Sequence, residues 1–130
     1  MDLGIAGKTA LVTGGSRGLG RQAALSLAAE GVNVAICGRT QDTLDSTVAE
    51  LEALGVKAIG LIGDVSDVET MAELHKNAVT GLGLIDILVN NAGIVGTDTP
   101  VRDLRVDDWD HVMDINLKGT FLCSRAAVRH

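Results

Sequence analysis

The apolar positions of the chain fall into short continuous runs and longer periodic segments. The short runs are typical of strands buried on both faces of a sheet, and they predict strands at Lys8–Thr13, Asn33–Cys37, Lys57–Ile62 and Ile85–Asn90. The periodic segments between them have the spacing of amphipathic helices. They predict helices at Leu19–Glu30 and Gln41–Leu54. A third helix is expected to share one face of Val68, Met71, Ala72, His75, Ala78 and Val79. A last helix is expected to run to the C-terminus, with a shared face of Trp109, Val112, Met113, Asn116 and Thr120.

This alternation of strand and helix predicts the fold class. Parallel strands joined by helical crossovers form an α/β fold, here a Rossmann-type, doubly wound parallel sheet with helices on both faces. We expect the strand order 3-2-1-4, with a ligand at the switch point between strands 1 and 4. The 130 residues are expected to belong to one domain. The long loop Gly93–Arg105 follows strand 4, where a substrate would enter.

Composition excludes several classes of function. The net charge is −6 and no basic cluster exists, so nucleic-acid binding has no electrostatic support. No apolar run approaches the roughly 18 residues of a membrane span, and the N-terminus does not resemble a signal peptide. The three histidines lack paired ligand spacing, so no metal site is expected. Cys37 and Cys123 are interpreted as buried, reduced thiols of a cytoplasmic protein.

The segment Thr13–Gly20 (Thr-Gly-Gly-Ser-Arg-Gly-Leu-Gly) joins the first strand to the first helix. A glycine-rich turn at this place suits a phosphate, because the free N–H groups and the dipole of the helix point at the anion. A plain glycine turn is the alternative. The segment does not end in Gly-Lys-Ser/Thr, so it is not the phosphate loop of a kinase or NTPase. The pattern therefore favours a dinucleotide.

The tip of the second strand indicates which dinucleotide. An acid at this tip binds the ribose 2′-hydroxyl of NAD, whereas a base accepts the 2′-phosphate of NADP. Here the tip reads Cys-Gly-Arg-Thr, with Arg39 and no acid, and Arg17 of the glycine turn can join it. Two solvated surface arginines are the alternative. Asp42 is expected in the first turn of the next helix, with Thr40 as a possible N-cap.

Asp64 follows the third strand and has two open interpretations. Its carboxylate can hydrogen-bond an adenine amino group. It can equally cap the helix that the chain enters through Ser66 and Asp67.

A fourth motif, Asn90-Asn91-Ala92-Gly93, follows the fourth strand. Together with Thr13–Gly20, Asp64-Val65 and Asn116 within Asp114–Gly119, it stands in the order and approximate spacing of one family. On these motifs the chain resembles the classical short-chain dehydrogenases/reductases over essentially all of its 130 residues. The resemblance is specific because four motifs occur in register.

The resemblance implies a role for each motif. The glycines form the turn around the pyrophosphate, and the side chains between them contact it. Arg39 holds the ribose phosphate, as in members that prefer NADP(H) over NAD(H), and Asp64 and Val65 flank the adenine. Asn91 lies near the cofactor ribose, and Thr13 ties its strand to the Asn90–Gly93 turn. The cofactor-binding positions expected on this basis are Thr13, Gly14, Ser16, Arg17, Gly18, Leu19, Gly20, Arg39, Asp64, Val65, Asn91, Ala92 and Gly93.

The family's chemistry is hydride transfer between a nicotinamide and a carbonyl or alcohol carbon, with a tyrosine, a lysine and a serine around the reacting oxygen. Of its four catalytic positions this chain has only Asn116, which in the family holds a water linked to the lysine. The alternative is an asparagine satisfied by neighbouring backbone groups. Asn116 and Gly119 both weaken a helix, so we expect a local compensation there.

The chain contains no tyrosine. Either it is the cofactor-binding part of a longer enzyme, or it is a complete, non-catalytic dinucleotide-binding module or sensor. We expect the first, because the apolar fourth strand would otherwise be a bare edge and the last helix has no stop signal. A methyltransferase is disfavoured because no acid stands at the tip of strand 2.

The resulting expectation is an NADP-dependent oxidoreductase, a carbonyl reductase or alcohol dehydrogenase similar to 3-oxoacyl reductases, acting on a small-molecule carbonyl or alcohol. Its substrate stays open, although Ile94, Val95 and Gly96 can line one wall of the pocket. The family also implies a homodimer or homotetramer. The face with Met113, Leu117 and Phe121 is a candidate contact.

Overall fold

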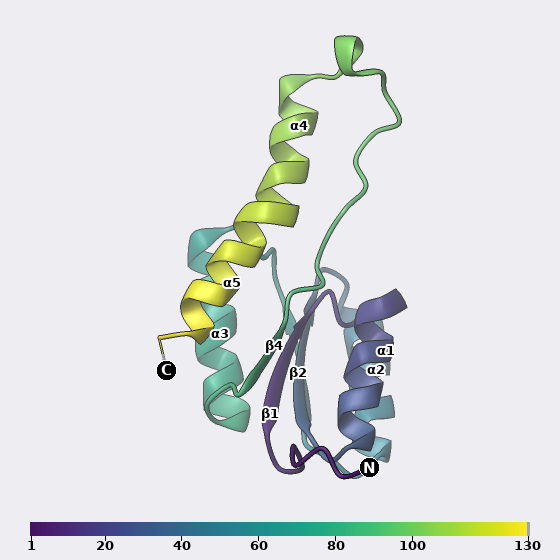
Figure 1. The fold of residues 1–130 in the computed structure, drawn as a ribbon, viewed down its shortest axis with the longest axis vertical. Helices are drawn as coiled ribbons and strands as arrows, with labels where there is room; N and C mark the ends of the chain where they lie inside the picture. The colour runs from purple at the N-terminus through teal and green to yellow at the C-terminus, as the bar shows by residue number, and fades with distance from the viewer. Residues whose placement is uncertain (130) are drawn as a thin grey trace.

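A computed structural model describes residues 1–129 of the chain. Four strands, β1 (Thr9–Thr13), β2 (Asn33–Gly38), β3 (Ala58–Ile62) and β4 (Ile87–Val89), form one sheet in the order β3-β2-β1-β4 (Figure 1). All three strand pairs are parallel. The predicted fold class and strand order are therefore confirmed. β1, β2 and β3 differ by at most one residue at either end from the strands that the apolar runs predict.

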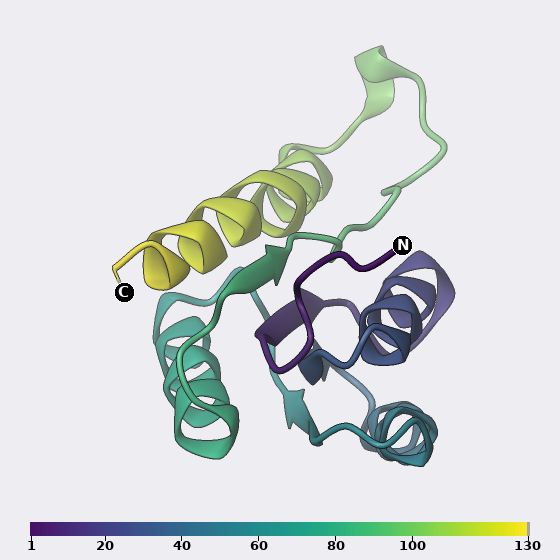
Figure 2. The same cartoon turned by 60° about the horizontal axis from the view of Figure 1, so that its bottom comes forward.

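Helices cover both faces of the sheet. They are α1 (Gly18–Ala29), α2 (Gln41–Ala53), α3 (Val68–Leu82), α4 (Val106–Met113) and α5 (Gly119–Ala127), with a 3₁₀ turn η1 (Val101–Asp103) and a π-helical turn η2 (Asp114–Lys118). Figure 2 shows the purple and blue α1 and α2 on one side of the strands, and the teal α3 and yellow α5 on the other. The loop after β4 extends beyond the carboxyl edge of the sheet before α4 begins (Figure 1).

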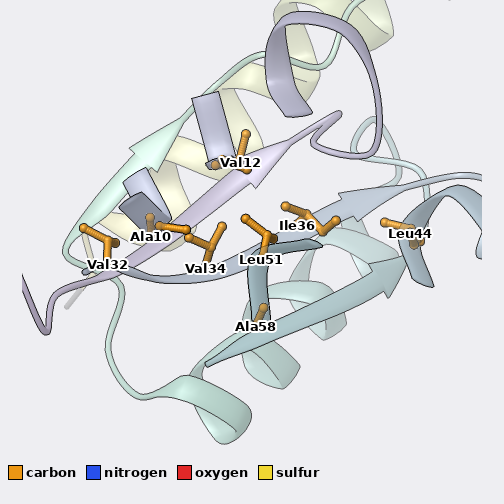
Figure 3. Packing of buried hydrophobic residues seen from close by; sticks show 10 residues of the cluster. Ala10, Val12, Val32, Val34, Ile36, Leu44, Leu51 and Ala58 are labelled. Carbon is orange, nitrogen blue, oxygen red and sulfur yellow. The ribbon is translucent and has the colours of Figure 1, made fainter. Parts of the chain in front are cut away.

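The strands separate two apolar clusters because successive side chains point to opposite faces. On the face of α1 and α2, Ala10 and Val12 of β1 pack with Leu44 and Leu51 of α2 (Figure 3). On the other face, Leu11 lies in the cluster that includes the buried side chains of α3 and α5. This double covering explains why the strand runs are apolar without alternation.

The fourth strand is shorter than the predicted Ile85–Asn90. Asp86 lies before β4, where its backbone N–H donates to Thr9 O at 2.9 Å and its carboxylate accepts from Thr9 N, also at 2.9 Å. At the other end, Asn91 N donates to the side chain of Thr13 rather than to a strand carbonyl. At each end of β4, a hydrogen bond to a side chain therefore stands where a ladder bond to a backbone carbonyl would be.

The predicted last helix runs without a break over residues 106–127, but it is not uniformly α-helical and its predicted buried face was wrong. The π-helical turn Asp114–Lys118 separates α4 from α5, and Trp109 of the predicted buried face is 56% exposed. The observed buried face consists of Ile115, Gly119, Leu122 and Cys123. Gly119 explains this choice: a Cβ there would lie 2.8 Å from Val65 Cγ2, so its missing side chain lets the helix approach the chain after β3.

The predicted face of the third helix was wrong in part. Its buried side chains are Met71, Leu74, His75 and Ala78, which have the spacing of one helical stripe. Val68 is 52% exposed because it starts the helix, and Ala72 is also exposed. The periodicity did not predict that Leu74 is buried, although it packs in the apolar cluster against the sheet.

Candidate nucleotide-binding site

A cleft of about 420 Å³ opens at the carboxyl ends of the strands. β1 and β4 are neighbours in space but far apart in the sequence, so this edge is the switch point of the sheet. The lining residues come from the end of β2, the start of α1, the loops after all four strands and the π-helical turn. They are Gly14, Ser16, Arg17, Leu19, Cys37, Gly38, Arg39, Gly63, Asp64, Val65, Asn91, Ala92, Gly93, Ile94 and Ile115.

The turn after β1 requires glycine. Gly14 and Gly18 have φ values of 62° and 58°, a left-handed conformation that other residues rarely adopt. A Cβ on Gly20 would overlap the carbonyl oxygen of Gly14 and the side-chain Nδ2 of Asn91. The backbone of α1 therefore approaches the end of β1 more closely than any side chain would allow.

The N-terminus of α1 fits an anion. Its N-cap residue Arg17 makes no side-chain capping hydrogen bond, and its first turn contains no acid. By contrast, α3 is capped by Asp67 and has Glu69 in its first turn. An uncapped helix start with glycines around it leaves N–H groups and positive dipole for a phosphate. This geometry fits the pyrophosphate of a dinucleotide.

Thr13 joins β1 to the turn after β4. Its buried hydroxyl oxygen accepts from Asn91 N and Ala92 N, both at 3.0 Å, and donates to Val89 O at 3.4 Å. The structure thus has the tie that the family resemblance implies for Thr13. It holds the two sides of the switch point at a constant separation.

Asn91 also holds the glycine turn. Its Nδ2 donates to Thr13 O and to Gly14 O, each at 3.1 Å. The side-chain amide is therefore committed to the backbone of β1 and its turn. The predicted proximity of Asn91 to a cofactor ribose stays a prediction, although the residue lines the cleft.

Arg17 and Arg39 both line the cleft, and Asp64 lies near them. Asp64 Oδ1 accepts from Ser66 Oγ at 2.7 Å and from Ser66 N at 2.9 Å. The Ser66 hydroxyl lowers the pKa of Asp64 most; burial opposes this shift, and the positive charge of Arg39 lowers the pKa further. Asp64 is therefore a carboxylate at neutral pH, within electrostatic reach of Arg39.

Of the two interpretations of Asp64, the helix cap was wrong. Asp67 caps α3, because its Oδ1 accepts from Thr70 N at 2.7 Å. That hydrogen bond also lowers the pKa of Asp67. Asp64 instead closes a turn with Ser66 and keeps a place in the cleft wall.

The start of α2 follows Arg39 directly. Thr40 is the N-cap residue and Asp42 stands in the first turn, as predicted, but the side chain of Thr40 makes no capping hydrogen bond. Thr43 Oγ1 donates instead to Thr40 O at 3.0 Å. α2 therefore begins two residues after the arginine expected to bind the ribose phosphate, with only its N-cap residue between them.

Asn116 lies in the π-helical turn and binds the loop after β4. Its Nδ2 donates to Ile94 O and its Oδ1 accepts from Ile94 N, both at 2.8 Å. The side chain is satisfied by backbone groups, as the alternative interpretation expected. The expected compensation for Asn116 and Gly119 consists of these two hydrogen bonds and of the close approach of Gly119 to Val65. Its relation to a catalytic water stays a prediction.

Ten of the expected cofactor residues line the cleft. Thr13, Gly18, Gly20 and Asn116 do not line it; Thr13 and Gly20 are buried and shape the turn. The lining residues Cys37, Gly38, Gly63 and Ile115 were not predicted as site residues. Gly63 carried a signal, since it stands directly before Asp64, whereas Ile115 lies in the π-helical turn, which the sequence did not predict.

Cys37 lines the cleft without being reactive. Burial raises the pKa of its thiol to about 12, and burial likewise raises the pKa of Cys123 to about 11. Both residues are free and buried, as predicted. The thiolate is the nucleophilic form, so neither side chain offers a nucleophile at neutral pH.

Two features of residues 1–129 bear on other functions. No group of three or more histidine, cysteine, aspartate or glutamate side chains in this part of the chain is arranged to hold a metal ion. None of its helices has the length and apolarity needed to cross a membrane.

The sheet order, the glycine turn and the cleft at the switch point define a Rossmann-type nucleotide-binding unit. Comparison with known families identifies it further: the short chain dehydrogenase model matches residues 8–130, and the chain belongs to this family. Relatives of the chain in this family include a dehydrogenase and a reductase, both of which are oxidoreductases.

Two relatives and one solved structure illustrate the similarity. The chain is 44% identical to the NAD(+)-dependent 2-dehydro-3-deoxy-L-rhamnonate dehydrogenase of Sphingomonas sp. SKA58, over 95% of this chain and 48% of that protein. It is 43% identical to the 3-oxoacyl-(acyl-carrier-protein) reductase FabG of Staphylococcus epidermidis, over 89% of this chain and 48% of the reductase. A short chain dehydrogenase from Burkholderia cenocepacia J2315, solved in complex with NADP, superposes with a TM-score of 0.92 at 40% identity, covering 97% of this chain and 51% of that one. The chain thus spans about half the length of the relatives it matches.

Proposed function

We propose that residues 1–130 are the NADP(H)-binding part of a short-chain dehydrogenase that interconverts a carbonyl and an alcohol on a small molecule. They form one domain together with the rest of that enzyme. NADP(H) is preferred over NAD(H). The enzyme resembles 3-oxoacyl reductases in this scheme, a comparison supported by the similarity to FabG.

The tip of β2 carries this proposal. Gly38 and Arg39 line the cleft there, where a cofactor site for NAD places an acid. Arg17 of the glycine turn lines the same cleft, so two guanidinium groups can grip one phosphate dianion. The relatives do not decide the preference, since one is named for NAD(+) and a solved structure contains NADP.

Each element of the chain has a defined task in this function. The bound cofactor supplies or accepts the hydride. The glycine turn and the start of α1 bind the pyrophosphate, Arg17 and Arg39 bind the 2′-phosphate, and the tie between Thr13 and the turn after β4 keeps the two sides of the cleft together. The loop after β4 forms the substrate side, where Ile94 lines the cleft and Val95 is fully exposed.

The proton in the reaction must come from outside these residues. The chain has no tyrosine, the residue that exchanges this proton in the family. The same fact favours the second candidate, a non-catalytic dinucleotide-binding module. The complete gene product distinguishes the two: oxidation of NADPH that depends on an added carbonyl compound supports the enzyme, and tight NADPH binding without any such oxidation supports the module.

The cofactor preference is tested by Arg39→Asp. One bidentate, charge-assisted contact is worth roughly 1.5–3 kcal/mol, so NADPH should bind about 10- to 100-fold more weakly, while NADH binding changes little. Dissociation constants from isothermal titration calorimetry measure both. Arg102→Asp is the matched control, because Arg102 lies in η1, is highly exposed and does not line the cleft. Equal losses for NADPH and NADH would remove Arg39 from the 2′-phosphate site.

We also propose that the enzyme is a cytoplasmic homodimer or homotetramer. Two free, buried cysteines suit a reducing compartment. The predicted contact face includes Leu117 and Phe121, whose side chains are 60% and 55% exposed in one chain. A molar mass from light scattering that falls to the monomer value in Phe121→Glu is the expected result, and a wild-type monomer would refute this part of the proposal.

A further inference from the structure

Thr47 is a buried polar residue on the apolar face of α2. The buried positions of this helix are Leu44, Thr47 and Leu51, and Thr47 is 1% exposed. Threonine is a weaker helix former than the straight-chain residues, and a buried hydroxyl costs free energy unless it is hydrogen-bonded. Valine would fill the same place without that cost. Packing alone therefore does not account for the hydroxyl.

The hydroxyl of Thr47 reaches out of its own helix. Its Oγ1 lies 2.9 Å from Thr43 O, one helical turn earlier, and 3.1 Å from Ser16 O in the glycine turn. The contact with Thr43 would suffice to satisfy the hydroxyl. A hydroxyl has one proton, so the two carbonyls share it. The part directed at Ser16 O links α2 to the backbone of the glycine turn, between Gly15 and Arg17.

Ser16 lies directly against the tip of β2. A Cβ on Gly38 would be 3.0 Å from Ser16 Oγ, so the absence of a side chain at position 38 allows this approach. A second hydrogen bond holds the same contact, from Gly15 N to Cys37 O at 3.1 Å. The glycine turn is thereby attached to both β2 and α2.

The two arginines of the cleft belong to the two segments that Thr47 joins. Arg17 follows Ser16 in the glycine turn, and Arg39 directly precedes the N-cap of α2. α2 is a continuous helix from Gln41 to Ala53, so a shift of this helix against the glycine turn changes the separation of the arginines. A clamp of two guanidinium groups on one phosphate depends on that separation.

We infer that Thr47 is a positioning residue that sets the separation of Arg17 and Arg39 and thereby the preference for a dinucleotide with a 2′-phosphate. This inference rests on the proposed function. The pyrophosphate of either dinucleotide is bound by the glycine turn itself. Loss of the Thr47 hydroxyl therefore weakens the binding of NADPH and leaves that of NADH nearly unchanged.

The test uses Thr47→Val in the complete gene product, with titration calorimetry of NADPH and NADH. The ratio of the NADH to the NADPH dissociation constant is expected to fall about fivefold, the effect of one hydrogen bond. Thr47→Ser keeps the hydroxyl and should retain the wild-type ratio. Thr43→Val is the matched control, because Thr43 is a half-buried threonine of the same helix whose hydroxyl donates to the carbonyl of Thr40 and not to the glycine turn. In an Arg39→Ala background, Thr47→Val should not change the ratio further.

A merely structural role would have a different signature. Equal weakening of NADPH and NADH by Thr47→Val, or no change in either, would overturn the inference, as would a Thr47→Ser variant that behaves like Thr47→Val. Thr47→Ala is a second variant without the hydroxyl, and circular dichroism reports whether each variant is folded. A wild-type protein that binds both dinucleotides equally would refute the proposed function itself. If Arg39→Ala changes the ratio of the NADH and NADPH dissociation constants but Thr47→Val does not, the inference about Thr47 is refuted and the proposed function stands.

Discussion

Replacing Thr13 with valine tests the tie across the switch point. Thr13 is 2% exposed, and its hydroxyl accepts hydrogen bonds from two backbone N–H groups, those of Asn91 and Ala92. Valine has nearly the same shape but cannot accept them. Each buried donor that loses its partner costs about 1–3 kcal/mol, so we expect the free energy of unfolding to fall by about 2–6 kcal/mol.

That loss is large against a typical stability of about 5–15 kcal/mol for a folded domain. Urea unfolding followed by circular dichroism measures it, and an unchanged slope would show that the denatured state is unaffected. Thr120→Val is the control: its hydroxyl donates to Asn116 O within the helix at 3.2 Å, and its removal should change stability by less than about 0.5 kcal/mol.

The variant should also bind dinucleotides more weakly, because the turn after β4 lines the cleft. The reasoning is refuted if Thr13→Val unfolds within about 0.5 kcal/mol of the wild-type protein. In that case the two N–H groups would have found other partners, and the tie would not hold the switch point together.

Two further predictions concern titration. Asp67 has a lowered pKa because it accepts from Thr70 N, so its contribution to stability is present above the pKa of the unfolded chain and is lost as the pH falls through the folded-state pKa. Asp67→Asn keeps an acceptor but does not titrate, and it should flatten the acid limb of a stability profile measured by urea unfolding; an unchanged acid limb would contradict the prediction. Burial raises the pKa of the Cys37 thiol from 9.0 to about 12. Its contribution to the free energy of unfolding is therefore complete below pH 9 and declines as the pH rises from 9 to about 12. Iodoacetamide should therefore modify Cys37 in urea but not in the native protein at pH 8, and fast native labelling on a mass spectrum would show that the thiol is accessible.

The sequence predicted the sheet well because its signals there are local. Unbroken apolar runs such as Leu11-Val12 require cover on both faces, and this requirement leaves few strand orders possible. The glycine turn was equally clear, since the positive φ of Gly14 and Gly18 is a property of those residues themselves. The end of β4 was missed because Thr13, almost eighty positions away, takes over its hydrogen bonds.

The π-helical turn and the buried face of the last helix could not be predicted for a related reason. Asn116 and Gly119 indicated a weak point, but the π-helical turn there depends on partners in other parts of the chain, Ile94 and Val65. Ile115 of this turn lines the cleft, and Trp109 of α4 is exposed. Likewise, nothing near Thr47 in the sequence indicates that its hydroxyl meets the carbonyl of Ser16.

The hydrogen bonds of Asn116 have a consequence for the loop after β4. One carboxamide offers Ile94 a donor and an acceptor, the same pair of groups that a residue in an adjacent strand would offer. Through Asn116, the helix thus makes with Ile94 the two hydrogen bonds that one residue of a neighbouring strand would make. In a hydrogen-exchange experiment, the amide of Ile94 should stand out as an isolated protected site beside the fast-exchanging Val95. An aspartate carboxylate at position 116 would accept from Ile94 N but could not donate to Ile94 O.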